Sequence, residues 1–164
     1  MKTILFSNKT KADIFNIIVI IYLLIFYIIP LQLLFLAPSS TIGLFFKNNF
    51  LLSSLNLIPL FIYFYSGVFY NIIKIDSYII NISSKRIKSS TANFNGLLDI
   101  KHEMLKSFYF KKNFLSWNTV LSISFKNDKS KIISKKIYLT LLSKKNKLKL
   151  EKSFNKILLK WVNF

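Results

Sequence analysis

The 164-residue sequence contains no cysteine, which excludes disulfide bonds, cysteine nucleophiles and thiolate metal sites. Glycine and proline are scarce, with three residues of each. The glycines lie far apart, at positions 43, 67 and 96, so they cannot form a glycine-rich phosphate-binding loop. Serine is frequent, but no G-x-S-x-G motif accompanies it. These absences remove most of the common catalytic arrangements.

Histidine occurs once, at His102, within the stretch DIKHEM. Asp99, His102 and Glu103 could approach one another if this stretch is helical, and such a group can begin a metal site. Against that reading, no second histidine is present, and carboxylates at i and i+4 are common on ordinary solvated helices. The sequence therefore predicts an exposed histidine, no catalytic residue, no metal ligand, no cofactor, and a protein that is not an enzyme.

Acidic residues are few: six carboxylates face 24 lysines and arginines, which gives a formal net charge of +18. One interpretation is a solvated surface enriched in lysine by AT-rich codons. A second is contact with the anionic inner leaflet of a membrane, where each lysine contributes about 1 kcal/mol. A third, nucleic-acid binding, is disfavoured because Arg86 is the only arginine and bidentate reading of bases depends on arginine.

Charged residues are absent from two long apolar runs. The first, Ile14 to Leu36, holds 23 residues and reaches about 34 Å as a helix, enough to span a bilayer. A cleaved signal peptide is the competing interpretation, but bulky Phe35 and Pro38 around Ala37 suit cleavage poorly. The second run, Phe50 to Tyr70, holds 21 residues and contains Pro59, which membrane helices tolerate.

The two runs predict a two-helix transmembrane hairpin. Polar and small residues at helical spacing indicate the faces on which the helices pack together. The candidate packing residues are Asn16 and Tyr27 on the first helix and Ser53, Asn56, Tyr63 and Gly67 on the second. No ionisable side chain lies inside either run, apart from tyrosine, which argues against a transport pathway.

The distribution of lysine predicts the orientation of this hairpin. Three lysines precede the first run, Lys47 alone lies between the runs, and 20 basic residues follow the second. The positive-inside rule then places both termini in the cytoplasm of a multi-pass inner-membrane protein. The predicted segments are a cytoplasmic N-terminus at 1–13, helices at 14–36 and 50–71, an external loop at 37–49, and a basic cytoplasmic domain at 72–164.

The segment 72–164 alternates like a small antiparallel β domain. In FLSWNTVLSISF, residues 114–125, apolar side chains recur at every second position, as in a half-buried strand. Residues 135–143 read as a further strand, and Leu148 with Leu150 as a short one. Residues 96–110 favour a short helix or an irregular segment, although Asn95-Gly96 could instead form a hairpin turn before a strand. The core aromatics are predicted to be Trp117, Phe125, Tyr138, Phe154 and Trp161.

The C-terminus predicts an amphipathic helix at 153–163. Phe154, Ile157, Leu158 and Trp161 recur at helical spacing, and Ser153 is placed to cap the first turn. The predicted fold class is thus an α+β membrane protein, in which a two-helix hairpin precedes a partly open barrel closed by a terminal helix.

Trp117, Asn118, Thr119 and Val120, at the start of an alternating strand, carry a resemblance to a known family. With membrane helices before the strands and a terminal helix after them, the chain resembles small bacterial membrane proteins with a pleckstrin-homology-like cytoplasmic domain. The usual acidic residue after the tryptophan is Asn118 here. The resemblance implies binding and assembly rather than catalysis.

The expected function is therefore non-enzymatic binding or scaffolding at the cytoplasmic membrane face. The partners are membrane lipid and a protein that the sequence does not identify, as it does not identify the oligomeric state. The candidate contact residues are Lys85, Arg86, Lys88, Lys111 and Lys112. The alternative is a small immunity or regulatory membrane protein that acts through its transmembrane hairpin.

Overall fold

The computed structural model describes residues 4–36, 39–49, 57–87, 96–112, 116–128 and 130–162. The chain divides into two compact units. One, the apolar unit, comprises Asp13–Ser66. The other, the β domain, comprises Met1–Ala12 together with Gly67–Phe164. The β domain is therefore built from both sides of the apolar unit in the sequence.

The apolar unit is helical throughout its described residues. Its elements are α1 (Lys9–Leu23, whose first residues belong to the β domain), a π-helical turn (Leu24–Ile28), α2 (Ile29–Leu36), α3 (Thr41–Asn48) and α5 (Leu57–Ser66). The π-helical turn lies just before Pro30, which has no N–H to donate to the preceding turn. The external loop expected at 37–49 thus contains a helix, α3.

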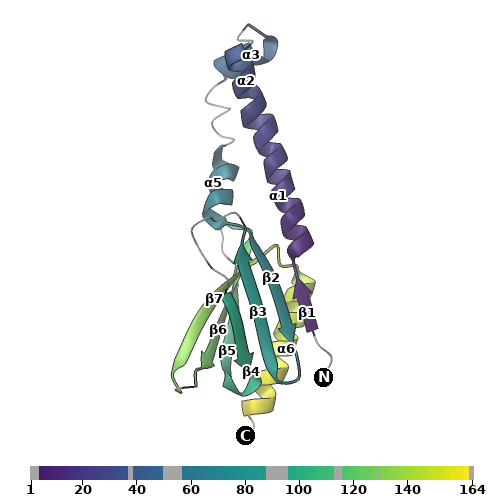
Figure 1. The fold of residues 1–164 in the computed structure, drawn as a ribbon, viewed down its shortest axis with the longest axis vertical. Helices are drawn as coiled ribbons and strands as arrows, with labels where there is room; N and C mark the ends of the chain where they lie inside the picture. Colours follow the sequence, from purple (N-terminus) through teal and green to yellow (C-terminus); the bar gives the residue numbers. More distant parts are fainter. Residues whose placement is uncertain are drawn as a thin grey trace. The chain divides into compact units, whose positions relative to one another are not determined.

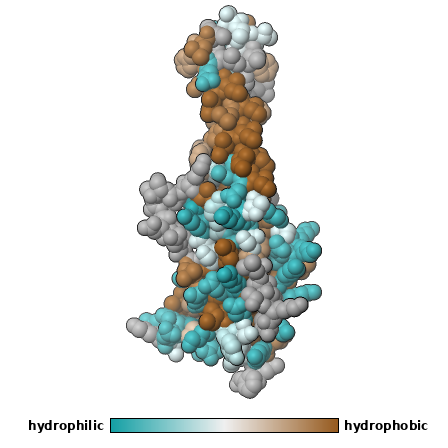
Figure 2. Space-filling view, turned by 45° about the vertical axis from the view of Figure 1, so that its right-hand side comes forward, coloured by the Kyte–Doolittle hydropathy of each residue, from teal (hydrophilic) through white to brown (hydrophobic). Residues whose placement is uncertain are grey.

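One continuous helix, Lys9–Gln32, is long and apolar enough to cross a membrane, and it is the one such helix among the described residues. At 24 residues it extends about 36 Å, against a hydrocarbon core of about 30 Å. Its side chains are mostly exposed, and they form the brown surface of the apolar unit in Figure 2. A lipid environment is the solvent that such a surface favours.

The predicted two-helix transmembrane hairpin is wrong. In the second apolar run, α5 has ten residues and reaches about 15 Å, half the thickness of the hydrocarbon core. The helix ends because Gly67 adopts a left-handed conformation, with φ of 64°. From Phe69 onward the expected helix is instead a strand, since alternation continues as far as Ile75. The sequence of 50–70 did not reveal this change because no charged residue interrupts the run.

The β domain contains two antiparallel sheets and one helix (Figure 1). The first sheet has the order β1-β2-β3-β4 and the second has the order β5-β6-β7. The strands are β1 (Ile4–Ser7), β2 (Phe69–Ile75), β3 (Ile79–Arg86), β4 (Gly96–Lys101), β5 (Leu105–Lys112), β6 (Asn118–Lys126) and β7 (Ile132–Thr140). A 3-10 turn, His102–Met104, joins the sheets, and α6 (Lys144–Val162) follows β7.

The core lies between the two sheets and under α6. Alternate residues of each strand point inward, including Ile73, Ile82 and Ile123, which are fully buried. α6 contributes Leu150, Phe154 and Ile157, and the ring of Phe154 packs 4.9 Å from that of Phe108 between centroids. Among the predicted core aromatics, Phe125 and Phe154 are buried, whereas Tyr138 and Trp161 are largely exposed.

Two segments differ from their expected secondary structure. Residues 96–110 form β4 and β5, because the 3-10 turn at His102 divides the apparent helical stripe into two alternating strands. Residues 144–150 belong to α6 rather than to a turn and a strand. The Ser143 hydroxyl accepts a hydrogen bond from the N–H of Asn146 (3.3 Å), and lysine-rich sequence propagates a helix well.

The N-terminal strand β1 was not expected, and its pairing with β2 brings residues from before and after the apolar unit into one sheet. Its residues pair with β2, so that Ser7 lies opposite Ile72. The chain leaves the β domain after Ala12 and returns to it at Gly67. Both ends of the apolar unit therefore connect to the same end of the β domain.

A buried amide cluster, made of Asn8, Asn71, Asn118 and Thr140, joins the strands at this end. Asn8 donates to the carbonyls of Phe69 (3.0 Å) and Thr140 (2.9 Å) and accepts from the N–H of Asn71 (2.7 Å). Thr140 donates to Asn118 (2.6 Å), which itself donates to the carbonyl of Gly67 (3.2 Å). All four side chains are buried. Their hydrogen bonds therefore take the place of the hydrogen bonds to water that buried polar groups cannot make.

Replacing Asn8 is expected to destabilise the β domain. Asn8→Ala removes three hydrogen bonds and leaves the N–H of Asn71 buried without its acceptor, which costs about 3 kcal/mol. Urea unfolding in neutral detergent micelles, followed by tryptophan fluorescence, measures the change. Asn155→Ala, on the exposed face of α6, is the matched control and should change stability by less than about 0.5 kcal/mol. Equal effects of the two substitutions would contradict the role given to the cluster.

Candidate membrane-facing site

The strand ends that meet at the buried amide cluster carry a group of basic side chains. We call this group the basic end and define it as Lys9, Lys11, Lys85, Arg86, Lys111 and Lys112. Lys85 and Arg86 end β3, opposite Tyr70 and Phe69 at the start of β2. Lys112 ends β5, opposite Thr119 at the start of β6. Lys9 and Lys11 begin the helix that leaves the domain.

Carboxylates of the β domain lie away from the basic end. Asp76, Glu103 and Asp128 occupy the turns at the opposite end, next to β2, β5 and β6. Asp99 lies within β4 and accepts a hydrogen bond from Asn81 (2.5 Å). Glu151 is in the middle of α6. Among the described residues of the β domain, the carboxylates therefore lie away from the basic end, and Asp13, at the start of the apolar unit, is the one carboxylate near it in sequence.

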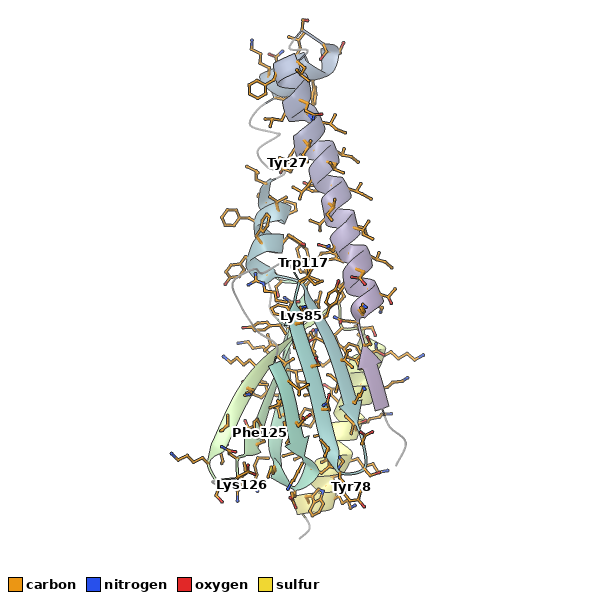
Figure 3. All side chains as sticks on the ribbon, in the orientation of Figure 1. Tyr27, Tyr78, Lys85, Trp117, Phe125 and Lys126 are labelled. Carbon is orange, nitrogen blue, oxygen red and sulfur yellow. The ribbon has the colours of Figure 1, made fainter. Side chains whose placement is uncertain are left out.

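Figure 3 makes the two ends of the β domain visible. It labels Lys85 and Trp117 near the end from which the chain leaves, and Tyr78 and Lys126 near the opposite end. Trp117 is half-buried and immediately precedes β6, and its carbonyl accepts from the N–H of Leu141 (3.2 Å). A tryptophan among lysines is the composition that membrane proteins concentrate at the lipid headgroups.

Arg86 is held in a fixed position within the basic end. Its guanidinium lies 5.9 Å from the centroid of the Phe69 ring, and Phe69 stacks on Tyr138 at 5.3 Å with an interplanar angle of 18°. The backbone of Gly67 lies against the same guanidinium, so that a Cβ there would lie 2.6 Å from Nε. Cation–π contact and close packing therefore orient the single arginine at the point where the chain returns.

The remaining candidate residues, most of them predicted helix-packing residues, divide into three groups. The hydroxyl of Tyr63 donates to Asn16 (2.6 Å), so these two predicted packing residues are in contact. Tyr27 lies in the π-helical turn, with its ring 6.3 Å from that of Tyr22. Gly67 belongs to the β domain, and Ser53 and Asn56 lie outside the described residues, as Lys88 does.

His102 is buried, with 5 % of its surface exposed, and so the expectation of a surface histidine is wrong. It lies in the turn between the sheets, where its backbone N–H donates to the carbonyl of Tyr78 (2.9 Å). Burial lowers the pKa of the imidazole, the charge of Lys160 lowers this pKa further, and Asp76 acts in the opposite direction. Nowhere in the described part of the chain do three or more histidine, aspartate or glutamate side chains gather as a metal site would require.

Comparison with protein-family models, with curated proteins and with solved structures finds no match for this chain.

The stability of the β domain should depend on the protonation of His102. Because the folded state lowers the pKa of this imidazole, the unfolded chain binds the proton more tightly. The stabilisation is full above the ordinary histidine pKa of about 6.5 and is lost as the pH falls toward the lower folded-state pKa. His102→Gln removes the titration, so its free energy of unfolding should decline less than that of the native protein between about pH 7.5 and pH 5. Urea unfolding at both pH values measures the two declines, and parallel declines would contradict this assignment.

Two substitutions of Gly67 should distinguish the cost of backbone strain at a positive φ from the cost of a steric clash between an added Cβ and Arg86. Gly67→Val places a β-branched residue at φ of 64° and is expected to cost about 1–3 kcal/mol of unfolding free energy. Gly67→Asn also adds a Cβ beside Arg86 but tolerates the left-handed region, so its cost should be smaller. Thermal unfolding followed by circular dichroism gives the order, and an equal loss in both variants would assign the cost to contact with Arg86 instead.

Proposed function

We propose that this protein is a non-enzymatic, membrane-anchored binding protein whose basic end engages the anionic lipid headgroups of the cytoplasmic leaflet. The observation that carries the proposal is that the candidate membrane helix and the basic end adjoin the same end of the β domain. The end of the β domain that continues into the candidate membrane helix is also the end where basic side chains gather without carboxylates.

Chain continuity supports the nearness of the basic end to the membrane. Lys9 and Lys11 lie in the first turn of the candidate membrane helix, and Arg86 packs beside Gly67, where the apolar unit ends. Lysines this close to an anionic leaflet lie within the Debye length of about 8 Å at physiological ionic strength. Each contributes about 1 kcal/mol of attraction near the surface.

The pairing of β1 with β2 supports a common side for both termini. Because strands that form one sheet occupy one compartment, Ile4–Ser7 and the remainder of the β domain must lie on the same side of the membrane. Lys2, Lys9 and Lys11 on this side, with 20 further basic residues after the second apolar run, favour the cytoplasm over the exterior.

The pleckstrin-homology-like resemblance stays a prediction, and the architecture supports it as part of this proposal. Two antiparallel sheets followed by a helix, with Trp117 directly before the alternating strand β6, are what the resemblance implies. A domain of that kind binds or assembles, in agreement with a non-enzymatic role. The alternative of a protective protein that acts through a two-helix hairpin loses its basis, since α5 is too short to span a bilayer.

Removing charge from the basic end should weaken contact with anionic lipid. In a Trp161→Phe background, Trp117 is the only tryptophan and reports on the basic end. In nanodiscs that contain brominated phosphatidylglycerol, its fluorescence should be quenched more than in neutral discs. The triple substitution Lys85→Gln, Lys111→Gln and Lys112→Gln should move this quenching to a higher fraction of anionic lipid, because about 1 kcal/mol of attraction per lysine is lost. High salt should have the same effect.

A matched variant controls for the change in net charge. Lys126→Gln, Lys131→Gln and Lys135→Gln remove three lysines from the opposite end of the domain and should leave the quenching unchanged. Equal shifts in the two triple variants would show that only the total charge matters. Quenching that is independent of anionic lipid would overturn the proposal.

A further inference from the structure

The two sheets of the β domain have four edge strands, of which β7 is the longest. β1 has four residues, β4 has six, β5 has eight and β7 has nine. β5 packs beside α6, whereas Figure 1 shows β7 as the outermost strand of the second sheet. An edge strand presents a row of N–H and C=O groups with which another strand can pair. β7 therefore offers the longest such row in the described sheets.

Alternate residues of β7 direct their backbone groups away from β6. In an antiparallel pair, the N–H and C=O of one residue point to the same side, and successive residues alternate in side. The carbonyls of Tyr138 and Thr140 accept hydrogen bonds from the side chains of Asn71 (3.0 Å) and Asn8 (2.9 Å), which lie outside the second sheet. The even-numbered residues of β7 therefore face outward, and the buried amide cluster caps the last two of them.

The first half of the same edge is open. The alternation places the backbone groups of Ile132, Ser134 and Lys136 on the outward side, and all three residues are exposed. The hydroxyl of Ser134 forms a hydrogen bond with that of Ser124 (2.7 Å), within the sheet. No described residue pairs with the outward backbone groups of these three residues. We call Ile132–Lys136 the open edge.

The backbone chemistry of the open edge indicates what can occupy it. A second strand presents N–H and C=O groups at the same repeat, so it can match every donor and every acceptor of the edge. Phosphate groups of lipids or nucleic acids accept hydrogen bonds but donate none, so they match the N–H groups and leave the carbonyls to water. An extended peptide segment is therefore the occupant that fits both.

Lysines beside the open edge select the charge of that segment. Lys135 and Lys136 are consecutive, so their side chains project to opposite faces of the sheet. Lys126 lies opposite Ile132 on β6, and Asp128, in the turn before β7, is the nearest carboxylate in the sequence. Lysines on an edge also discourage pairing with neutral strands and with a second copy, which would bring the same charges. An acidic strand would neutralise them instead.

We propose that the open edge binds an extended acidic segment of a partner protein by strand addition. The backbone groups of Ile132, Ser134 and Lys136 form its hydrogen bonds, and Lys135 and Lys136 attract its carboxylates. Three outward-facing residues make a short site, so the complex is transient rather than obligate. The site extends the proposed function to a protein partner, and it does not rest on contact between the basic end and lipid.

The test uses the full chain in nanodiscs of neutral phosphatidylcholine, one copy in each disc, so that its result is independent of anionic lipid. The probe is a short fluorescent peptide of alternating valine and glutamate, and anisotropy measures its binding. Ser134→Pro removes the outward N–H at a position where an edge strand tolerates proline, and it should weaken binding about fivefold or more. Ser134→Ala also loses the hydroxyl but keeps the N–H, so it is the matched control and should bind as the native protein does.

The charge of the site is tested in the same assay. Lys135→Gln with Lys136→Gln should weaken binding and reduce its dependence on salt. Lys74→Gln with Lys101→Gln removes two exposed lysines from the first sheet and should have a smaller effect. Equal binding by the Ser134→Pro and Ser134→Ala variants would overturn the proposal. Undiminished binding of a peptide whose backbone nitrogens are methylated would also overturn it.

Hydrogen exchange of the native protein identifies the occupant without any substitution. The peptide should slow exchange of the N–H groups of Ile132, Ser134 and Lys136, whereas β4, another edge strand, should exchange as before. Protection of these groups without peptide in discs that hold two copies would assign the open edge to self-association. Protection by anionic discs alone would assign it to lipid headgroups, and either result would overturn the proposal.

Discussion

The structure depends on satisfying backbone polar groups at the place where the chain leaves the β domain and later returns. The ends of β1, β2, β6 and β7 meet there, and the apolar unit separates the first two by some 60 residues. Without Asn8, Asn71, Asn118 and Thr140, the carbonyls of Gly67, Phe69 and Thr140 and the N–H of Phe69 would lose these hydrogen-bond partners. The amide side chains bridge both sheets because each can donate and accept at once.

This arrangement also determines where charge can reside. Strands that converge on a buried polar cluster must direct their terminal side chains outward around it, which places Lys85, Arg86, Lys111 and Lys112 in one region despite their separation in sequence. The guanidinium of Arg86 lies over the Phe69 ring, which in turn stacks on Tyr138. The geometry of the fold thus brings basic side chains that are distant in the sequence to one end of the β domain.

Local patterns in the sequence predicted the elements that are buried by apolar packing, which requires no particular partner residue. The alternation around Leu121 and Ile123 found a buried strand, and Phe154 with Ile157 found the apolar face of the terminal helix. The sequence could not reveal that Asn118 is buried, since its partners lie 22 and 51 residues away. The strand β1 was missed for the same reason: four residues beside a lysine-flanked apolar run have no strand signal until β2 is present. His102 was misassigned because its burial depends on a turn between sheets, not on its neighbours in sequence.

The course of the chain imposes an order of events on biosynthesis. The candidate membrane helix follows β1 directly, so both leave the ribosome before any residue of β2 has been made. β1 cannot pair during that interval, and the β domain cannot complete its first sheet until the whole apolar unit has emerged. Under the proposed membrane anchoring, insertion of the candidate helix can begin before the β domain completes its first sheet, and a chain that folds without inserting has to carry the exposed apolar unit through water. Because the first strand precedes the long apolar helix, the proposed anchoring would make the nascent chain expose apolar surface until it reaches the bilayer.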